Sequence, residues 1–217
     1  MTPAPLRGAA GEVHGRDLPH PAGPGVAVRW IEATGPALVL GSRQRDGVDA
    51  AACARDGVEL CRRRSGGGAV WLAPAAHLWV EFLVAPSDPR WDDDVARACG
   101  WVGDAWATAL AEEGLVRGGG LGVHRGPLER DAGVCFAAMG PGEVSLEGAK
   151  LVGVAQRRTR EGARFQCVVH ARWDAAPYAR YAPGLGAVPG AVATIPALAD
   201  TDAAAALVAR LEEVVAR

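Results

Sequence analysis

Short apolar runs bounded by glycine- or proline-containing turns recur along the chain, and this pattern predicts β-strands. The segment Leu78–Val84 is apolar at every position except Glu81, which indicates a strand buried on both faces. A turn at residues 160–162 separates two runs that are expected to pair as a hairpin, Lys150–Gln156 and Arg164–His170. Further strands are predicted at Val26–Ile31, Ala37–Leu40, Val58–Cys61, Gly133–Ala138 and Glu143–Leu146.

Three helices are predicted. After Asp88-Pro89, a capping residue followed by proline, the apolar positions step by four or three residues up to Gly114. An alanine-rich segment predicts a second helix over Val48–Arg55, and Thr201-Asp202 is expected to open a third. These elements predict an α+β fold, with a mixed, largely antiparallel sheet and helices packed against it.

The organisation along the chain is expected to be simple. Residues 1–24 contain five prolines and predict an irregular lead-in. Residues 25–217 then form a single domain, which is long enough to bury a core.

Net charge and cysteine content exclude several classes of protein. The formal charge of -2 argues against binding to nucleic-acid backbone, which requires a positive excess. No segment is long and apolar enough for a bilayer or a signal peptide, so we expect a cytoplasmic protein without a membrane partner. The five cysteines lack CxxC spacing, which predicts buried reduced thiols and no metal site.

One segment combines positive charge with glycine. Arg62-Arg63-Arg64-Ser65 runs into Gly66-Gly67-Gly68 and then a strand. Three glycines allow backbone N–H groups to approach a ligand closely, while arginines supply charge, so the segment is suited to a phosphate. A flexible turn with a solvated basic edge is the alternative.

Lys150 is the only lysine among 23 basic residues. Lysine and arginine differ, because a compact ammonium has a readily shifted pKa and a guanidinium is a planar fork. Strand alternation would place Lys150 on one face with Val152, Val154 and Gln156, at the edge of an apolar strip. An ordinary surface lysine on an edge strand remains the alternative.

Two motifs together resemble one enzyme family. RRxSGGGxV at residues 62–70, followed by GxKLVGxAQRR at residues 148–158, is similar to the motif pair of the lipoate-protein ligase and octanoyltransferase family. The upstream Gly41-Ser42-Arg43-Gln44 resembles the GxxQ segment of this family. The resemblance implies a fold similar to the catalytic core of biotin ligases and class II synthetases.

The resemblance also implies an activity. It implies attachment of a lipoyl or octanoyl group to a lysine of a lipoyl domain through an acyl-adenylate, with ATP and magnesium as substrate and ion. Lys150 falls on the catalytic lysine of the family. The residues implied to line the substrate and its phosphate are Arg63, Ser65, Gly66, Gly67, Gly68, Gly153 and Ala155.

Some positions depart from the ligase pattern. Ligases of the family continue SGGGxV with His-Asp, whereas this chain continues with Trp71-Leu72 and reaches a histidine only at His77, which we expect to be structural. The second hairpin strand has Gln166-Cys167-Val168 where the family often has Gln-His-Gly. The sequence ends at Arg217 without the small C-terminal accessory domain of such ligases, so a separate accessory domain is a possible partner.

Cys135 opens a second interpretation. It resembles the nucleophilic cysteine of one octanoyltransferase branch, which takes the acyl group from an acyl-carrier-protein thioester without ATP. A buried apolar cysteine is the alternative. The SGGG form favours the ligase, a noncatalytic acyl-adenylate binder is a third hypothesis, and the acceptor would be a lipoyl domain of a 2-oxoacid dehydrogenase or glycine cleavage protein. Arg157-Arg158 could steer such an acidic domain toward the site.

Overall fold

The computed structural model describes residues 4–17, 23–116, 119–130 and 133–217, and it contains two β-sheets. The larger sheet has seven strands in the order β1-β2-β6-β10-β9-β8-β7, and every neighbouring pair is antiparallel except β1 and β2. Its strands are β1 (Leu6–Gly8), β2 (Val26–Ala33), β6 (His77–Val84), β7 (Leu121–Val123), β8 (Val144–Leu146), β9 (Ala149–Arg158) and β10 (Ala163–His170).

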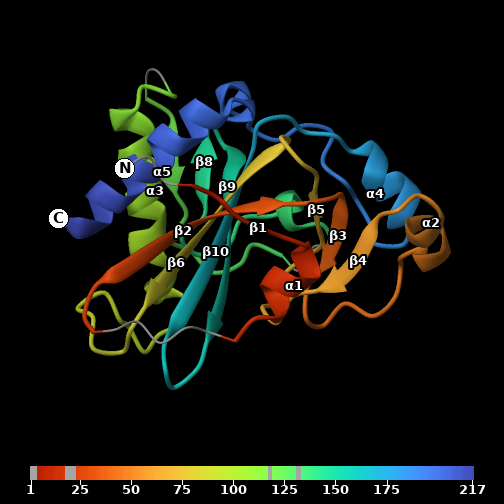
Figure 1. Cartoon of the computed structure of the whole chain (residues 1–217). Helices are drawn as coiled ribbons and strands as arrows, with labels where there is room; N and C mark the ends of the chain where they lie inside the picture. The colour runs from red at the N-terminus through yellow and green to blue at the C-terminus, as the bar shows by residue number, and fades with distance from the viewer. Residues whose placement is uncertain (1–3, 18–22, 117–118, 131–132) are drawn as a thin grey trace.

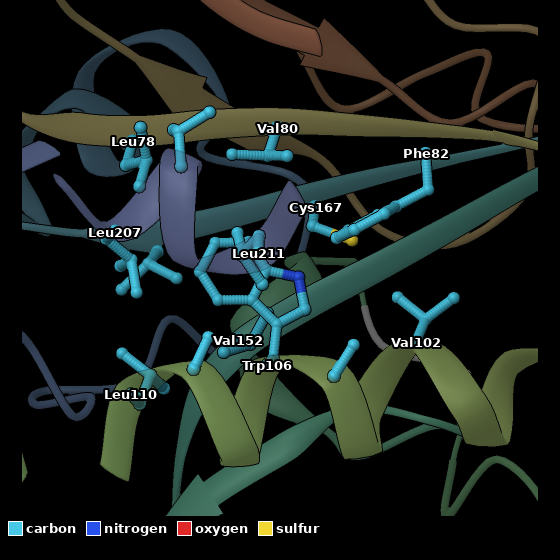
Figure 2. Close-up of a cluster of buried hydrophobic side chains, with 14 of the residues drawn as sticks. Leu78, Val80, Phe82, Val102, Trp106, Leu110, Val152, Cys167, Leu207 and Leu211 are labelled. Atoms are coloured by element: carbon cyan, nitrogen blue, oxygen red, sulfur yellow. The ribbon is translucent and has the colours of Figure 1, made fainter. Parts of the chain in front are cut away.

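Two helices cover one face of this large sheet. These are α3 (Gly100–Glu112) and α5 (Thr201–Ala216), which is preceded by a short 3-10 helix, η3 (Pro196–Ala199) (Figure 1). Trp106 of α3 points from the helix toward the strands, belongs to the same buried cluster as Leu211 of α5, and is fully buried (Figure 2). The apolar residues that lie at helical spacing in both helices therefore pack into a common core.

A second, smaller sheet lies on the other face. It contains β4 (Glu59–Arg62), β3 (Ala37–Leu40) and β5 (Val70–Leu72) in that order. Buried side chains of this sheet pack with Ile31 and Trp79 of the large sheet. Three short helices flank the small sheet: α1 (Ala10–Gly15), α2 (Ala50–Arg55) and α4 (Ala176–Tyr181) (Figure 1). The glycine-rich segment 66–68 joins β4 and β5 of the small sheet, whereas Lys150 lies on β9 of the large sheet.

The predicted fold class is confirmed. The sheet is mixed and largely antiparallel, helices pack against it, and the predicted hairpin of β9 and β10 is present. Among the described residues, no helix has both the length and the apolar character needed to cross a bilayer.

The predicted helix start at Asp88-Pro89 is wrong. The structure has a 3-10 helix, η1 (Arg97–Cys99), and α3 begins at Gly100. The buried Asp88 carboxylate instead accepts hydrogen bonds from the backbone N–H groups of Gly25 (2.7 Å) and Arg90 (2.8 Å), so it fixes a loop. A capping residue before proline is equally suited to a turn.

Two further segments differ from expectation. Gly133–Ala138 does not form the predicted strand, because only Val134 bridges to Ala69 and the chain then turns into a 3-10 helix, η2 (Cys135–Ala137). The lead-in is not irregular throughout, since Leu6–Gly8 and Ala10–Gly15 form β1 and α1. Both elements are held by contacts with distant residues, as when Glu59 accepts hydrogen bonds from the N–H groups of Ala10 and Gly11.

Candidate active site

The glycine-rich loop is held from within by Arg63. This side chain is buried, and its guanidinium donates hydrogen bonds to the carbonyl oxygens of Gly66 and Gly68, each at 2.8 Å. Within the described residues, the hydrogen bonds of Gly66 and Gly68 involve these carbonyls, so their N–H groups are available to a ligand. Arg63 therefore shapes the loop, and the expected anion contacts come from backbone N–H groups rather than from its charge.

The segment Gly41–Gln44 packs closely against this loop. A Cβ at Gly41 would lie 1.9 Å from the carbonyl oxygen of Gly67, so only glycine fits, and Gly67 itself has a φ of 93°. The Gln44 amide accepts from the N–H of Gly41 and donates to the carbonyl of Gly133, both at 2.9 Å. Ser65 is also buried, and its Oγ has no hydrogen-bond partner among the described residues.

Lys150 is buried, with 5% of its side chain exposed. Its Nζ donates to the carbonyl oxygens of Cys135 (2.7 Å) and Ala138 (2.9 Å) and lies 2.5 Å from Oε2 of Glu143. The ammonium thus binds both ends of the turn that carries Cys135. A surface lysine on an edge strand would not have these contacts, so the structure excludes that alternative.

Glu143 is the carboxylate that neutralises Lys150. Its oxygens also accept hydrogen bonds from the N–H groups of Gly140 (2.7 Å) and Val154 (3.1 Å). Burial raises the pKa of Glu143 above its ordinary value, although the Lys150 cation and these N–H donors oppose the shift. The sequence motifs do not assign Glu143 to the site. A buried ammonium needs a carboxylate partner, and this need is the signal that could have pointed to Glu143.

Cys135 lies beside the ammonium, with its Sγ 3.9 Å from Nζ of Lys150. It is half-buried at the start of η2. Burial raises the pKa of the thiols of Cys53, Cys61, Cys99 and Cys167. All five are free thiols, as the sequence predicts, but only Cys135 contacts the lysine.

Two connected spaces meet at Cys135. The open one, which we call the cleft, has a volume of about 360 Å³ and is lined by residues including Gly66–Gly68, Cys135, Glu143 and Lys150. The smaller one, which we call the inner chamber, has a volume of about 30 Å³. The chamber is lined mostly by apolar side chains, together with His14, Arg63, Cys135 and Gln166. Cys135 thus lines both an open cleft that contains charged groups and a small apolar space.

Three residues of the predicted face of β9, Lys150, Val154 and Gln156, line the cleft, but Val152 does not. Gly153 and Ala155 line the inner chamber, whereas Val152 is buried in the core beneath α3 (Figure 2). A Cβ at Gly153 would lie 3.3 Å from the Phe136 ring, so glycine lets η2 pack closely on the strand. The expectation that Val152 shares the site face with Lys150 is therefore wrong, and the β8–β9 pairing contains a register shift between Val144 and Ser145.

Other candidate positions lie outside the site. His77 begins β6 opposite His170 and does not line the cleft, in agreement with a structural role. Arg158 packs on Trp91 at 4.1 Å and donates to the backbone carbonyls of Asp92 and Asp93, which ties β9 to the loop before α3. Among the described residues, there is no group of three or more His, Cys, Asp or Glu side chains that could hold a metal ion.

Comparison with protein families gives one match that spans most of the chain. Residues 22–209 match the family described as lipoyl protein ligase A/B catalytic domain. The chain belongs to this family. Lys150 and the Gly66–Gly68 loop thus lie within a lipoyl protein ligase A/B catalytic domain. Comparison with curated protein sequences finds no significant match.

Solved structures similar to this domain include lipoate ligases. A putative lipoate protein ligase from Thermoplasma acidophilum with bound lipoic acid has a TM-score of 0.69 and 16% identity, covering 100% of this chain and 87% of that one. Lipoate-protein ligase A bound with ATP has a TM-score of 0.68 and 19% identity, covering 88% and 73%. A bipartite lipoate protein ligase from T. acidophilum, described with its E2 lipoyl domain, has a TM-score of 0.62 and 18% identity, covering 88% and 71%. At such low identities, these TM-scores show a shared fold and nothing more.

Proposed function

We propose that this protein transfers an octanoyl or lipoyl group from a carrier-protein thioester to a lysine of a lipoyl domain, with Cys135 as the intermediate acyl carrier. One observation carries the proposal. The Cys135 thiol lies 3.9 Å from the buried ammonium of Lys150, where the open cleft meets the apolar inner chamber. A nucleophile at such a junction can receive a donor from the cleft while the hydrocarbon chain enters the apolar space, which must widen from about 30 Å³ to hold it.

In the first step, the Cys135 thiolate attacks the carbonyl carbon of the donor thioester. The new bond joins Sγ to that carbon, the bond to the carrier sulfur breaks, and the carrier leaves as a thiolate that takes up the proton lost by Cys135. The Lys150 ammonium favours the Cys135 thiolate by its charge. The product is an acyl-enzyme thioester and a free carrier thiol.

In the second step, the neutral amine of the acceptor lysine attacks the acyl-enzyme carbonyl. A C–N bond forms, the C–S bond breaks, and the amine proton passes to the Cys135 sulfur, which restores the thiol. In both steps negative charge develops on the carbonyl oxygen. The Lys150 ammonium supplies positive charge near that oxygen, while its own N–H groups are held by Cys135, Ala138 and Glu143. The N–H groups of the Gly66–Gly68 loop are the donors that we assign to the oxygen itself.

The site does not fit a magnesium ion held by side chains. Glu143 is the one carboxylate among the described residues that line the cleft, and its two oxygens are bound to Lys150 and to the N–H groups of Gly140 and Val154. Magnesium beside a nucleotide needs a carboxylate with a free oxygen. This arrangement favours the transferase over magnesium-dependent activation of the acid.

A second candidate function is a ligase that forms an acyl-adenylate. The glycine loop favours it, because backbone N–H groups facing a cleft of about 360 Å³ are suited to a nucleotide phosphate. A relative of the same fold is described as bound with ATP, and another is bipartite. A ligase reaction would then use ATP and a lipoyl-domain acceptor, with a separate accessory domain as a further partner.

Donor identity separates the two candidates. A purified lipoyl domain is incubated with the enzyme and either octanoyl-carrier thioester or octanoate with ATP and magnesium, and its mass is measured. The transferase predicts modification from the thioester alone, lost in Cys135→Ser and retained in Cys61→Ser. Cys61 is a matched control, because it is also half-buried but does not line the cleft. Modification only from octanoate with ATP, unchanged in Cys135→Ser, would establish the ligase instead.

A further inference from the structure

His14 presents an unpaired nitrogen within the inner chamber wall. The side chain comes from α1, is only 5% exposed, and stacks on Trp79 with ring centroids 4.7 Å apart. It lines the chamber beside Val168 and Phe136, yet its Nε2 has no hydrogen-bond partner among the described residues. A buried polar atom without a partner is costly, so such an atom beside an apolar space indicates a missing ligand group.

The surrounding hydrogen bonds determine which His14 nitrogen carries the proton. Glu81 accepts from the Arg164 guanidinium and, at 2.7 Å, from Nε2 of Gln166. The amide oxygen of Gln166 is therefore the atom that faces Nδ1 of His14, at 3.0 Å, and an oxygen can only accept. Nδ1 must carry the hydrogen.

The ring is neutral, so Nε2 is a bare acceptor. Burial, followed by the charges of Arg63 and Arg164, lowers the pKa of His14 to about 3. With Nδ1 protonated and the ring neutral, Nε2 has a lone pair and no hydrogen. Only a ligand group that donates a hydrogen bond can satisfy it.

We propose that His14 determines acyl-chain specificity by accepting a hydrogen bond from a hydroxyl or thiol near the far end of the chain. This inference rests on the proposed function, because Cys135 places the reacting carbonyl at the chamber and the chain can reach His14 only by widening that chamber from about 30 Å³. A chamber of about 30 Å³ has room for a small terminal group. A methyl group or a cyclic disulfide cannot donate to Nε2, whereas a hydroxyl or a free thiol can.

Binding of unreactive amides tests this assignment without acyl transfer. Dissociation constants are measured by calorimetry for octanoyl N-methylamide and for its isostere in which a hydroxyl replaces the terminal methyl. The thiol is tested with dihydrolipoyl and lipoyl amides, which have the same carbon chain, with two S–H groups in the first and a ring closed by an S–S bond in the second. For each pair, the ratio of the two dissociation constants measures the preference for the compound that can donate a hydrogen bond. We expect this preference to be about 3- to 10-fold larger in wild-type protein than in a protein lacking the Nε2 acceptor.

Two variants of His14 form a matched pair. His14→Asn keeps a donor near Nδ1 for Gln166 but removes the acceptor, so the relative preference should fall by about 3- to 10-fold. His14→Gln places an amide oxygen near the Nε2 position and should retain the preference. Ratios equal within about twofold in wild type and His14→Asn would overturn the inference. The inference would also be overturned if wild-type protein bound the lipoyl amide as tightly as the dihydrolipoyl amide and showed equal affinity for octanoyl N-methylamide and its hydroxyl isostere.

These outcomes are distinct from those of the acyl-transfer experiment. If the preference for amides that donate a hydrogen bond depends on His14 but no thioester is turned over, His14 keeps its assignment and the Cys135 chemistry is wrong. If thioester turnover depends on Cys135 but the amide ratios do not change, the transferase stands and the role of His14 is structural.

Discussion

The two faces of the seven-stranded sheet bury different kinds of side chain. Beneath α3 and α5 the buried cluster contains apolar residues and the cysteines Cys99 and Cys167, as the packing around Trp106 shows (Figure 2). Toward the small sheet the protein buries ionised groups, among them the pairs Lys150–Glu143 and Arg164–Glu81. Burying charge is expensive, so the second face is expected to cost stability that the apolar packing of the first face supplies.

The largest effect is expected from separating the buried ion pair. Glu143→Gln leaves the Lys150 ammonium without a counterion in a site where only 5% of its side chain is exposed. We expect the free energy of unfolding to fall by about 3–5 kcal/mol, measured by urea denaturation. The double variant Glu143→Gln with Lys150→Met removes the unpaired charge and keeps an amide beside the N–H groups of Gly140 and Val154, so it should recover part of this loss. A double variant no more stable than Glu143→Gln would contradict the role of the unpaired charge.

A truncation on the helix face should separate stability from activity. Leu110 of α3 is fully buried, and Leu110→Ala should lower the free energy of unfolding by about 2–5 kcal/mol. Acyl transfer per folded molecule, measured well below the midpoint of thermal unfolding, should stay near the wild-type value. A large loss of activity in folded Leu110→Ala would show that the two faces are coupled.

Lys150→Arg should instead lower the activity of the folded protein. It keeps a positive charge, but the planar guanidinium cannot reproduce the contacts of one ammonium with Cys135, Ala138 and Glu143. We expect kcat/KM for acyl transfer to fall about 10²- to 10³-fold. Arg125→Lys, in an exposed ion pair with Asp104, is the control and should be nearly silent. Wild-type activity in Lys150→Arg would mean that the single lysine reflects composition alone.

Mild acid should destabilise the small-sheet face. Burial lowers the pKa of His14 and of His170 from 6.5 to about 3, so the unfolded chain binds protons at pH 5.5 that the folded protein does not. Stability is therefore lost as the pH falls below 6.5, by about 1.4 kcal/mol at pH 5.5 for each histidine. Urea denaturation at pH 7.5 and 5.5 measures the loss, and His170→Phe should reduce it by about one histidine's share. An unchanged pH dependence in this variant would contradict the assignment.

Sequence patterns predicted the parts of the fold that depend on local periodicity. The strands at Leu78–Val84 and Arg164–His170 and the final helix follow from runs of apolar residues. The segment with β1 and α1 was missed, because a three-residue strand and a six-residue helix have too little periodicity and depend on distant partners such as Ile31 and Glu59. The acceptor nitrogen of His14 lies in that missed segment.

The motifs predicted where the site lies better than how its side chains act. Lys150, Cys135 and the glycine loop do meet at one cleft. The inward orientation of Arg63 could not be predicted, because sequence does not show whether loop carbonyls or N–H groups face the solvent. The partnership of Glu143 with Lys150 depends on the register of β8 and β9, which a bulge shifts.

The mass of the intact protein after mixing with an octanoyl-carrier thioester, without ATP or a lipoyl domain, tests the central claim most directly. The transferase predicts a rapid gain of one octanoyl group on Cys135, located by peptide mapping, released by added lipoyl domain, and absent in Cys135→Ser. An enzyme that modifies the lipoyl domain from this thioester without passing through an acylated Cys135, or that never reacts with the thioester, would contradict it.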